Sequence, residues 1–488
     1  MKIQLVFAPP RERARYEVLS ENLWPPLGVL YLASSVRKKI PEVQVKVTDG
    51  CQLGYAATLA QIQEFRPQIL GISFYTTTAN GAICLAREIK RTLPTTVVVM
   101  GGPHATALPS DTLRESKADV VLVGEGESSF PQLVQRVMEN GGNGSVRLWE
   151  KIAGACYYSE DTERPIRQNP PAKFVARLDD IAFPAWDLVD FHNYKGWYLS
   201  KQSPEAPILS SRGCPFCCTF CSNAVWKSSN PAWRHRSACN VVDEIELLHR
   251  VHGINEFFDQ ADEFNTSVNV AMEICHEIKR RKMPITWKAQ LRARPFTEDL
   301  AKAMAEAGCW YVHLGVESGN QETLDGVGKK TTLQEVESTC RWLCKYNIRV
   351  LALFMIYNAG EKDGKLFFED TKKSENTLEY AHRLVKKGLI NYISWSVTTP
   401  YPGSKLYDIG LRHQLITPAL LKDWEAWQTT ELFPMKLPGV HRRNQGTLKR
   451  KGEWLRAKCL LKNGNFKYKD FFFLVKRGMH VLFSSGEN

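Results

Sequence analysis

Residues 212–221 read Arg212-Gly213-Cys214-Pro215-Phe216-Cys217-Cys218-Thr219-Phe220-Cys221 and place four thiols within eight positions. Cys214, Cys218 and Cys221 follow the spacing C-x3-C-x2-C, which lets one loop hold three irons of a cubane [4Fe–4S] cluster. The fourth iron then has no protein ligand and stays open to a small molecule. The stretch therefore predicts an iron–sulfur centre that does substrate chemistry.

Cys217 permits a second interpretation of the same stretch. Cys214-x2-Cys217 and Cys218-x2-Cys221 are two CxxC pairs, the usual half-sites of structural zinc. Zinc ribbons separate such pairs by a dozen or more residues so that the chain can fold back around the metal, whereas here the pairs abut. The zinc alternative would make the chain a metal-stabilised adaptor for nucleic acid or a membrane.

The cysteine loop directly follows the first strand of a repeating strand–helix pattern. Six apolar runs separated by helical patterns predict a partial (β/α)6 barrel of the TIM type, whose chemistry lies at the C-terminal ends of its strands. The expected strands are Ala206–Ser210, Glu256–Phe258, Thr286–Gln290, Tyr311–Gly315, Val350–Ile356 and Tyr392–Thr398.

The N-terminal residues carry another strand–helix series, which predicts a Rossmann-like, flavodoxin-like α/β domain. Each strand leads into a loop of small or polar residues, and in such folds ligands bind outside the carboxyl ends of the strands. The expected strands are Ile3–Ala8, Val45–Thr48, Ile69–Phe74, Val97–Met100 and Val120–Val123.

Length and composition fit a protein of several domains. The chain has 488 residues, 43% of them hydrophobic, and single cores rarely grow beyond about 250 residues. Its 13 cysteines are odd in number and irregularly spaced, which is typical of reduced thiols in the cytosol. We expect four parts: an α/β domain at 1–140, a linker at 141–205, the barrel at 206–413 and a small, mostly helical C-terminal region at 414–488.

Cys214, Cys218 and Cys221, read with the barrel pattern, resemble the radical S-adenosylmethionine (SAM) superfamily. The N-terminal half is similar to the cobalamin (B12)-binding domain of its largest subclass, which includes the class B methyltransferases. The resemblance implies that SAM chelates the open iron and is cleaved to a 5′-deoxyadenosyl radical. It implies three cofactors: the [4Fe–4S] cluster, SAM and cobalamin.

The same resemblance implies which residues contact SAM. Glu317, in Gly315-Val316-Glu317-Ser318-Gly319, matches the acidic residue that accepts hydrogen bonds from the ribose hydroxyls. Arg292 matches a residue that meets the SAM carboxylate as a charge-assisted pair. The full expected set is Phe220, Asp262, Glu263, Arg292, Glu317 and Ser318.

The cobalamin contacts are expected in three loops of the N-terminal domain. The Asp-x-His-x-x-Gly motif of a lower axial histidine is absent, and its nearest match, Asp190-Phe191-His192-Asn193-Tyr194-Lys195, lacks the glycine. The corrin is therefore expected to lie against loop side chains, with His104 a hydrogen-bonding partner rather than a cobalt ligand. The expected set is Ser73, Phe74, Tyr75, Gly101, Gly102, His104, Gly124, Glu125 and Gly126.

The C-terminal 48 residues are strongly basic, with twelve Lys or Arg against three Asp or Glu. Aromatic and basic residues mix in 466–477, and such a segment suits either a packed helix or the surface of an anionic membrane. We expect a cytoplasmic enzyme, with this segment available for peripheral contact at the inner face of the membrane. Nucleic acid is not an expected partner.

The leading hypothesis is a cobalamin-dependent radical SAM methyltransferase acting on an unactivated carbon of a small molecule or lipid. It needs an external electron donor such as flavodoxin or ferredoxin. The enzyme alternative is a cobalamin-independent radical SAM cyclase or carbon–carbon coupling enzyme. No protein side chain is singled out as reacting with the substrate.

Overall fold

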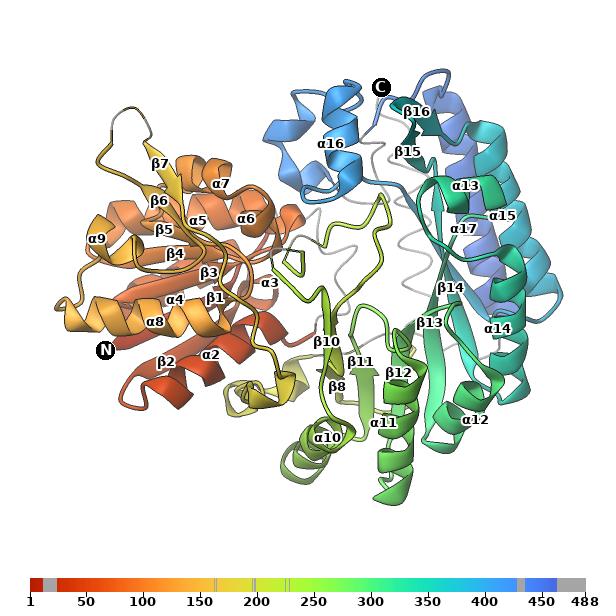
Figure 1. Cartoon of the computed structure of the whole chain (residues 1–488), viewed down its shortest axis with the longest axis horizontal. Coiled ribbons are helices and arrows are strands. Elements are labelled where there is room, and N and C mark those ends of the chain that lie inside the picture. The colour runs from red at the N-terminus through yellow and green to blue at the C-terminus, as the bar shows by residue number, and fades with distance from the viewer. Residues whose placement is uncertain are drawn as a thin grey trace.

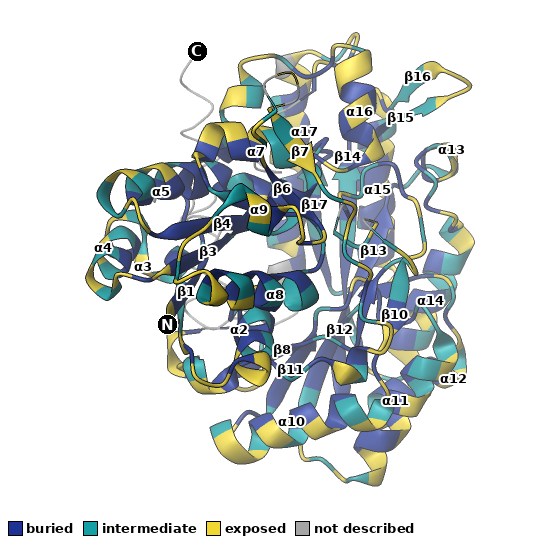
Figure 2. Cartoon of the chain, turned by 60° about the vertical axis from the view of Figure 1, so that its left-hand side comes forward, coloured by how far each residue is buried: buried dark blue, intermediate teal, exposed yellow. Residues whose placement is uncertain are grey.

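The computed structural model describes residues 1–11, 24–161, 163, 165–194, 196, 199–223, 225–227, 229–427 and 435–462. Two α/β units lie side by side, the N-terminal one at the left of Figure 1 and the larger barrel at the right. In both, the strands are buried and the exposed residues gather on the outer faces of the helices (Figure 2). The fold class is the one predicted from the sequence.

The N-terminal unit is a twisted parallel sheet in the order β2-β1-β3-β4-β5. The strand order reverses between β1 and β3, which is the flavodoxin-like arrangement and puts a ligand-binding crevice at that edge. The strands are β1 (Lys2–Phe7), β2 (Gln44–Asp49), β3 (Ile69–Ser73), β4 (Val97–Gly101) and β5 (Val120–Leu122).

Helices cover both faces of this sheet because its strands are apolar on both sides. Along β4, Val97 and Val99 pack toward one layer of helices, whereas Val98 and Met100 pack toward the other. One layer holds α2 (Leu27–Lys39) and α8 (Gly126–Glu139). The other holds α4 (Tyr55–Phe65), α5 (Ala79–Thr92) and α7 (Pro109–Ser116), with the short α3 (Gly50–Leu53) and α6 (Pro103–Ala107) at strand ends.

The segment predicted as a linker begins as part of this domain. After α9 (Val146–Trp149), strands β6 (Ala155–Tyr158) and β7 (Ile166–Gln168) extend the sheet in antiparallel fashion. The sequence prediction missed them because both strands are short and prolines flank β7. The chain then crosses to the barrel through three single turns, η2 (Leu178–Asp180), η3 (Trp186–Leu188) and η4 (Phe191–Asn193).

The second unit is an open barrel of six parallel strands in the order β17-β14-β13-β12-β11-β8, as the sequence predicted. A large apolar core fills the space between the strands and their helices. The strands are β8 (Glu205–Ile208), β11 (Glu256–Asp259), β12 (Thr286–Arg292), β13 (Cys309–Glu317), β14 (Arg349–Ile356) and β17 (Tyr392–Val397). The outer helices are α10 (Ala238–His252), α11 (Val268–Arg280), α12 (Glu298–Glu306), α13 (Gln321–Gly326), α14 (Leu333–Lys345), α15 (Thr371–Lys386) and α16 (Lys405–Arg412).

The barrel helices begin at side-chain caps that are readable in the sequence. Ser237 accepts a hydrogen bond from the backbone of Asn240 at the start of α10, and Thr332 forms a reciprocal capping box with Glu335 at the start of α14. Gly253 ends α10 in a left-handed conformation. These caps fix where the two helices begin and where α10 ends.

Two smaller elements decorate the barrel. A hairpin of β15 (Ala359–Lys362) and β16 (Lys365–Phe368) follows β14, and α17 (Arg442–Lys462) packs against α15 and β17. Single turns η5 (Leu420–Lys422) and η6 (Trp424–Ala426) lie against the N-terminal unit. No helix in the described part of the chain combines the length and the apolar character needed to cross a membrane. Residues 463–488, including the aromatic and basic segment, lie outside the described residues.

Candidate active site and cofactor cavity

The three predicted cluster cysteines lie in the connection between two short antiparallel strands, β9 (Ser211–Gly213) and β10 (Trp233–His235). This connection follows β8 at the open end of the barrel. Gly213, at the base of the connection, has a φ of +84°, and a Cβ there would come within 2.0 Å of the carbonyl oxygen of Ala232. Only glycine fits this turn, which brings the chain into the cysteine loop.

The thiol groups are largely withdrawn from water, and that suits a metal cluster. Burial first, and then the carboxylate of Glu263, raise the pKa of Cys214 to about 12, and burial raises that of Cys221 to about 12. A lone thiolate is costly in such a place, so these cysteines need the positive charge of iron to ionise. Cys218 is buried, whereas Cys217 is exposed. In the described part of the chain no three His, Cys, Asp or Glu side chains converge on a single metal ion.

Arg292, at the end of β12, lies directly beside the cluster loop. Its Nη1 is 3.9 Å from Sγ of Cys218 and 3.4 Å from Oε1 of Glu263, and the Phe216 ring centroid is 3.8 Å from its guanidinium carbon. Nε and Nη2 of Arg292, and Oε2 of Glu263, are buried without a hydrogen-bond partner in the protein. Buried polar atoms are normally satisfied, so these mark a binding site. The donors suit the methionyl carboxylate of SAM and the acceptor suits its amino group.

The structure gives Asp262 a different neighbour from the one expected. Its Oδ2 accepts a hydrogen bond from the backbone of Gly213 at 3.1 Å, and its side chain also bonds Asn223. Desolvation raises the pKa of this carboxyl group to about 6. Asp262 thus ties Gly213 and Asn223, on either side of the three cysteines, to the end of β11. These contacts favour a supporting role over direct contact with SAM.

Glu317, the predicted ribose acceptor, ends β13 in a strained conformation. The ladder to β14 shifts register between Gly315 and Glu317, and Glu317 has a φ of +71°. Backbone strain of this kind costs about 1–3 kcal/mol and concentrates at functional sites. Its Oε1 accepts a hydrogen bond from Nζ of Lys329 at 2.9 Å. The bend turns this carboxylate toward the cluster side of the barrel mouth.

Sequence reasoning missed Lys329. It stands in Gly328-Lys329-Lys330, which reads as an ordinary basic turn, yet Lys329 is buried and Lys330 is exposed. Burial alone would lower the pKa of Lys329, but Glu317 first and then Cys218 raise it above its ordinary value. The same turn contacts the cluster loop, since Sγ of Cys218 lies 3.8 Å from the carbonyl oxygen of Gly328. Lys329 is therefore a buried cation between Cys218 and the carboxylate of Glu317.

Two predicted SAM residues, Ser318 and Phe220, make their contacts within the barrel. Ser318 is fully buried, donates to Oε1 of Glu369 at 2.7 Å and contacts the hydroxyl of Thr377 at 3.1 Å. It braces the bend at Glu317 from behind. Phe220 packs against the apolar core of the barrel. The placement of Ser318 gives no support to a contact with SAM, whereas for Phe220 that contact stays a prediction.

A cavity of about 460 Å³ lies between the N-terminal domain and the barrel. Of the nine predicted cobalamin residues, seven line it: Ser73, Tyr75, Gly101, Gly102, Gly124, Glu125 and Gly126. The barrel contributes Leu209, Arg212, Val225, Trp226 and Gln260. Backbone-rich glycine loops below and apolar side chains around suit a large planar ligand.

Tyr75 projects into this cavity. Its side chain is 53% exposed, so the ring is open to the cavity. The protein around it still desolvates the hydroxyl group and raises the pKa of Tyr75. An edge-to-face contact with Phe7, 5.2 Å between ring centroids, fixes its position. The ring thus offers an aromatic surface to a cofactor.

Phe74 and His104 do not line the cavity, contrary to expectation. Phe74 is fully buried in the sheet–helix core, and His104 is 3% exposed. Nδ1 of His104 is 3.1 Å from Oγ1 of Thr76, and its ring packs edge-on against Trp424 at 4.8 Å between centroids. His104 therefore joins the N-terminal domain to the C-terminal segment and cannot reach a ligand in the cavity.

The barrel with three thiols at its mouth, facing a cavity in a flavodoxin-like domain, defines the class of radical SAM enzymes with a cobalamin-type domain. Two family models match the chain: the B12 binding domain over residues 18–134 and the Radical SAM superfamily over residues 208–367. The chain belongs to the radical SAM superfamily, in the branch that carries a B12 binding domain. Its cofactors are a [4Fe–4S] cluster, SAM and cobalamin, and this membership decides against the zinc adaptor.

Similar proteins agree with this placement. The chain is 32% identical over 488 residues to an uncharacterized methyltransferase, PH0819, of Pyrococcus horikoshii, covering 99% of this chain and 98% of that one. It is 28% identical to the anaerobic magnesium-protoporphyrin IX monomethyl ester cyclase of Rubrivivax gelatinosus, covering 79% and 66% of the two chains. The fold matches the cobalamin-dependent SAM radical enzyme OxsB with a TM-score of 0.71 and 16% identity, over 99% of this chain and 71% of that one.

Proposed function

We propose that the protein transfers a methyl group from SAM to an unactivated carbon of a small molecule. The observation that carries this proposal is the cavity of about 460 Å³, which opens between the cobalamin-type loops and the barrel segment that bears the cysteines. When bound, the cluster and SAM supply a radical that activates a C–H bond, and cobalamin carries the methyl group.

The residues of the chain have separate tasks in this scheme. Cys214, Cys218 and Cys221 hold the cluster, and the unpartnered atoms of Arg292 and Glu263 hold the methionyl end of SAM. Glu317 accepts from the ribose hydroxyls, with its charge balanced by Lys329. These groups fix the reactive carbon of SAM at the barrel mouth and exclude water from it.

The cavity residues act on the cofactor of the N-terminal domain. Tyr75 offers its ring to the corrin, and the glycine loops let the backbone approach it closely. A small redox protein, flavodoxin or ferredoxin, is the electron donor that the scheme requires. In this scheme the substrate binds in the space between the two cofactors.

The rival function is a cyclase or carbon–carbon coupling enzyme that uses no cobalamin, and the similarity to the Rubrivivax cyclase favours including it in the test. Protein reconstituted anaerobically with iron, sulfide and hydroxocobalamin would be incubated with a reductant, trideuteromethyl-SAM and fractionated cell extract. Methylation predicts 5′-deoxyadenosine, S-adenosylhomocysteine and a product that carries three deuterium atoms. Deoxyadenosine without S-adenosylhomocysteine, from protein that retains no cobalt chromophore, would establish the rival.

A further inference from the structure

Two arginines stand opposite each other at the base of the cysteine loop. Arg212 on β9 and Arg234 on β10 are directly paired in the antiparallel register, and residues 214–232 between these strands form the loop. Both arginines are buried, with side chains only 5% and 4% exposed. Two buried cations at one base would repel each other strongly, so something must neutralise them.

The neutralising charges come from the other domain. Nη1 of Arg212 lies 2.6 Å from Oε1 of Glu127 and 3.3 Å from Oε1 of Glu125. Arg234 bonds both oxygens of Glu125, Nη2 to Oε1 and Nη1 to Oε2 at 3.1 Å. Glu125 thus bridges the two strands at the base of the loop. Two carboxylates balance two guanidinium groups, all of them at least nine-tenths buried.

Glu125 and Glu127 belong to the loop Gly124-Glu125-Gly126-Glu127 after β5, which also lines the cofactor cavity. The expectation that Glu125 binds cobalamin is therefore not supported for its carboxylate, since the arginines occupy both oxygens. All four residues of this loop border the cavity, and its two carboxylates pair with the arginines at the base of the cysteine loop. One short segment thus contacts both cofactor sites.

Aromatic rings hold the arginines in place. The guanidinium carbon of Arg212 lies 4.5 Å from the ring centroid of Tyr31 on α2 and 5.8 Å from that of Trp226. Arg234 lies 4.3 Å from the ring centroid of Phe174 and donates to the carbonyl oxygen of Val175 at 2.8 Å. Planar guanidinium groups suit such combined stacking and forked pairing, which an ammonium group cannot copy.

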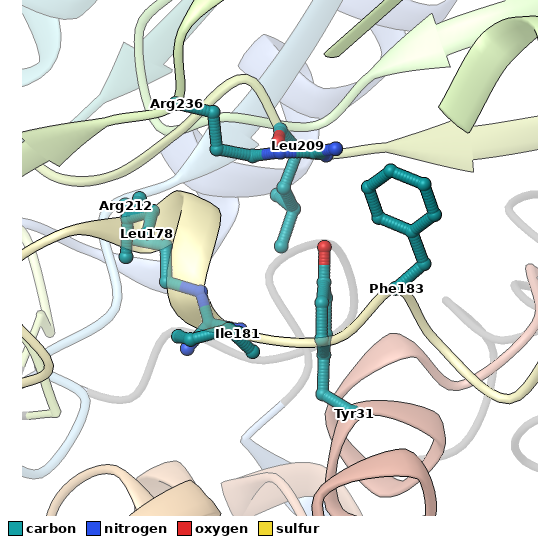
Figure 3. A pocket seen from close by; sticks show the side chains of 7 residues that line it. All are labelled: Tyr31, Leu178, Ile181, Phe183, Leu209, Arg212 and Arg236. Atoms are coloured by element: carbon teal, nitrogen blue, oxygen red, sulfur yellow. Dashed lines mark hydrogen bonds between the residues drawn. The ribbon is translucent and has the colours of Figure 1, made fainter. Parts of the chain in front are cut away.

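Figure 3 shows the junction around Tyr31 from close by. The Tyr31 ring stands upright between Ile181 and Phe183, with its hydroxyl end toward Leu209 and Arg236 of the barrel. The remaining free space has a volume of about 10 Å³, no more than one water molecule. At this point the N-terminal domain, the linker and the barrel are therefore closely packed.

A buried ion cluster of this kind does not stabilise a protein more than apolar packing would, but it allows only one alignment of the surfaces. We propose that Glu125, Glu127, Arg212 and Arg234 form an interdomain lock that fixes the cluster-binding loop relative to the floor of the cofactor cavity. They are positioning residues, because their charged groups are paired with one another. The inference rests on the two cofactor sites of the proposed function, yet its test does not need turnover.

The test compares the double variant Glu125→Gln/Glu127→Gln with a matched control, Glu277→Gln. Glu277 is also a buried carboxylate paired with arginines, Arg280 and Arg281, but these pairs lie at the end of α11 inside the barrel. Iron content and circular dichroism verify that each protein folds. Hydrogen exchange of residues 213–223 is then measured in the cluster-loaded protein, with and without hydroxocobalamin, together with the EPR change of the reduced cluster on adding SAM.

We expect exchange in the cysteine loop to rise at least tenfold in the double variant without cobalamin, and the SAM-induced EPR change to broaden. Hydroxocobalamin should slow exchange of the loop in the wild type and in Glu277→Gln, but not in the double variant. Unchanged exchange in the double variant, or an equal rise in the control, would overturn the lock. Where even the wild type binds no hydroxocobalamin, the methyltransferase proposal fails, and the cobalamin-free comparison still decides the lock. Arg212→Lys, which keeps the charge and loses the fork, should give an intermediate rise and serves if the double variant does not fold.

Discussion

Nζ of Lys329 lies 2.9 Å from Oε1 of Glu317, and this ion pair closes the barrel mouth between the cysteine loop and the end of β13. Both side chains are buried, at 6% and 12% exposure. The pair joins a carboxylate at the strained end of β13 to a cation whose pKa is also raised by Cys218. It places one positive and one negative charge beside the cysteine loop, where we propose that SAM binds.

The first prediction concerns this cation. Lys329→Gln leaves the charge of Glu317 buried without its partner, which typically costs several kcal/mol, so the bend at Glu317 should relax. We expect the Kd for SAM, measured by equilibrium dialysis on cluster-loaded protein, to rise at least tenfold. Lys330→Gln is the control. It removes the same charge from an exposed side chain one residue away, so it should change the Kd by less than about twofold. Equal effects of the two variants would show that only the net charge of the turn counts.

A second prediction separates the cysteines. Cys218→Ala removes a buried thiol beside Arg292 and should abolish the iron–sulfur absorbance and the cleavage of SAM. Cys217→Ala removes an exposed thiol one residue away and should retain about four irons per chain. Iron and sulfide analysis of anaerobically purified protein measures both. Loss of iron in Cys217→Ala alone would mean that the loop uses a different trio.

The framework of the protein could be predicted from the sequence because it rests on local patterns. Each barrel strand and the cysteine motif occupy only a few consecutive residues. Apolar runs that alternate with helical patterns identify the parallel sheets. The pairing of Arg212 with Glu125 spans 87 positions of sequence and could not be predicted. Lys329 was missed for the same reason, since only the fold reveals that its side chain is buried beside Glu317.

The cavity loops show a finer limit. Successive residues of extended chain point in opposite directions, so Ser73 and Tyr75 reach the cavity while Phe74 between them turns into the core. His104 is lost to the cavity because α6 begins at Pro103 and rotates the following side chain toward Trp424. Identifying a loop as ligand-binding thus does not tell which of its side chains bind.

A third prediction follows from the direction of Tyr75. Tyr75→Ala removes the aromatic surface from the cavity and should lower retention of hydroxocobalamin after gel filtration at least tenfold. Tyr75→Phe keeps the ring and its contact with Phe7, so retention should stay within about twofold of the wild type. The cobalt chromophore measures both. A loss in Tyr75→Phe as large as in Tyr75→Ala would assign the binding to the hydroxyl group.

A fourth prediction concerns pH. Burial lowers the pKa of His104 to about 4 from the ordinary 6.5, so the native protein keeps this ring neutral where the unfolded chain protonates it. The stability that depends on the neutral ring is present above about 6.5 and is lost as the pH falls toward 4. Between pH 7.5 and 5, the wild type should lose about 2 kcal/mol more unfolding free energy than His104→Gln.

Urea unfolding of the apoprotein, followed by the fluorescence of the tryptophans, measures this difference. Between pH 7.5 and 8.5 the two proteins should change in parallel, because both forms of the chain then carry a neutral ring. A constant difference down to pH 5 would show that His104 takes up its proton without leaving the contact with Trp424.

The last prediction compares two adjacent glycines of the cavity floor. Gly102 has a φ of +95°, and a Cβ there would lie 2.8 Å from Oγ of Ser73 and 2.9 Å from the backbone of Phe74. Gly102→Ala is therefore both strained and overlapped, and should lower the unfolding free energy by about 2 kcal/mol or more. At Gly101 the nearest atom to a Cβ is a carbonyl oxygen 3.8 Å away, so Gly101→Ala should cost less than about 1 kcal/mol. Gly102, in the loop after β4, lies against Ser73 and Phe74, which directly precede Tyr75. The Gly102 variant should therefore also lose hydroxocobalamin. If Gly102→Ala kept both stability and cofactor, the close approach of these two loops could not be what shapes the floor of the cavity.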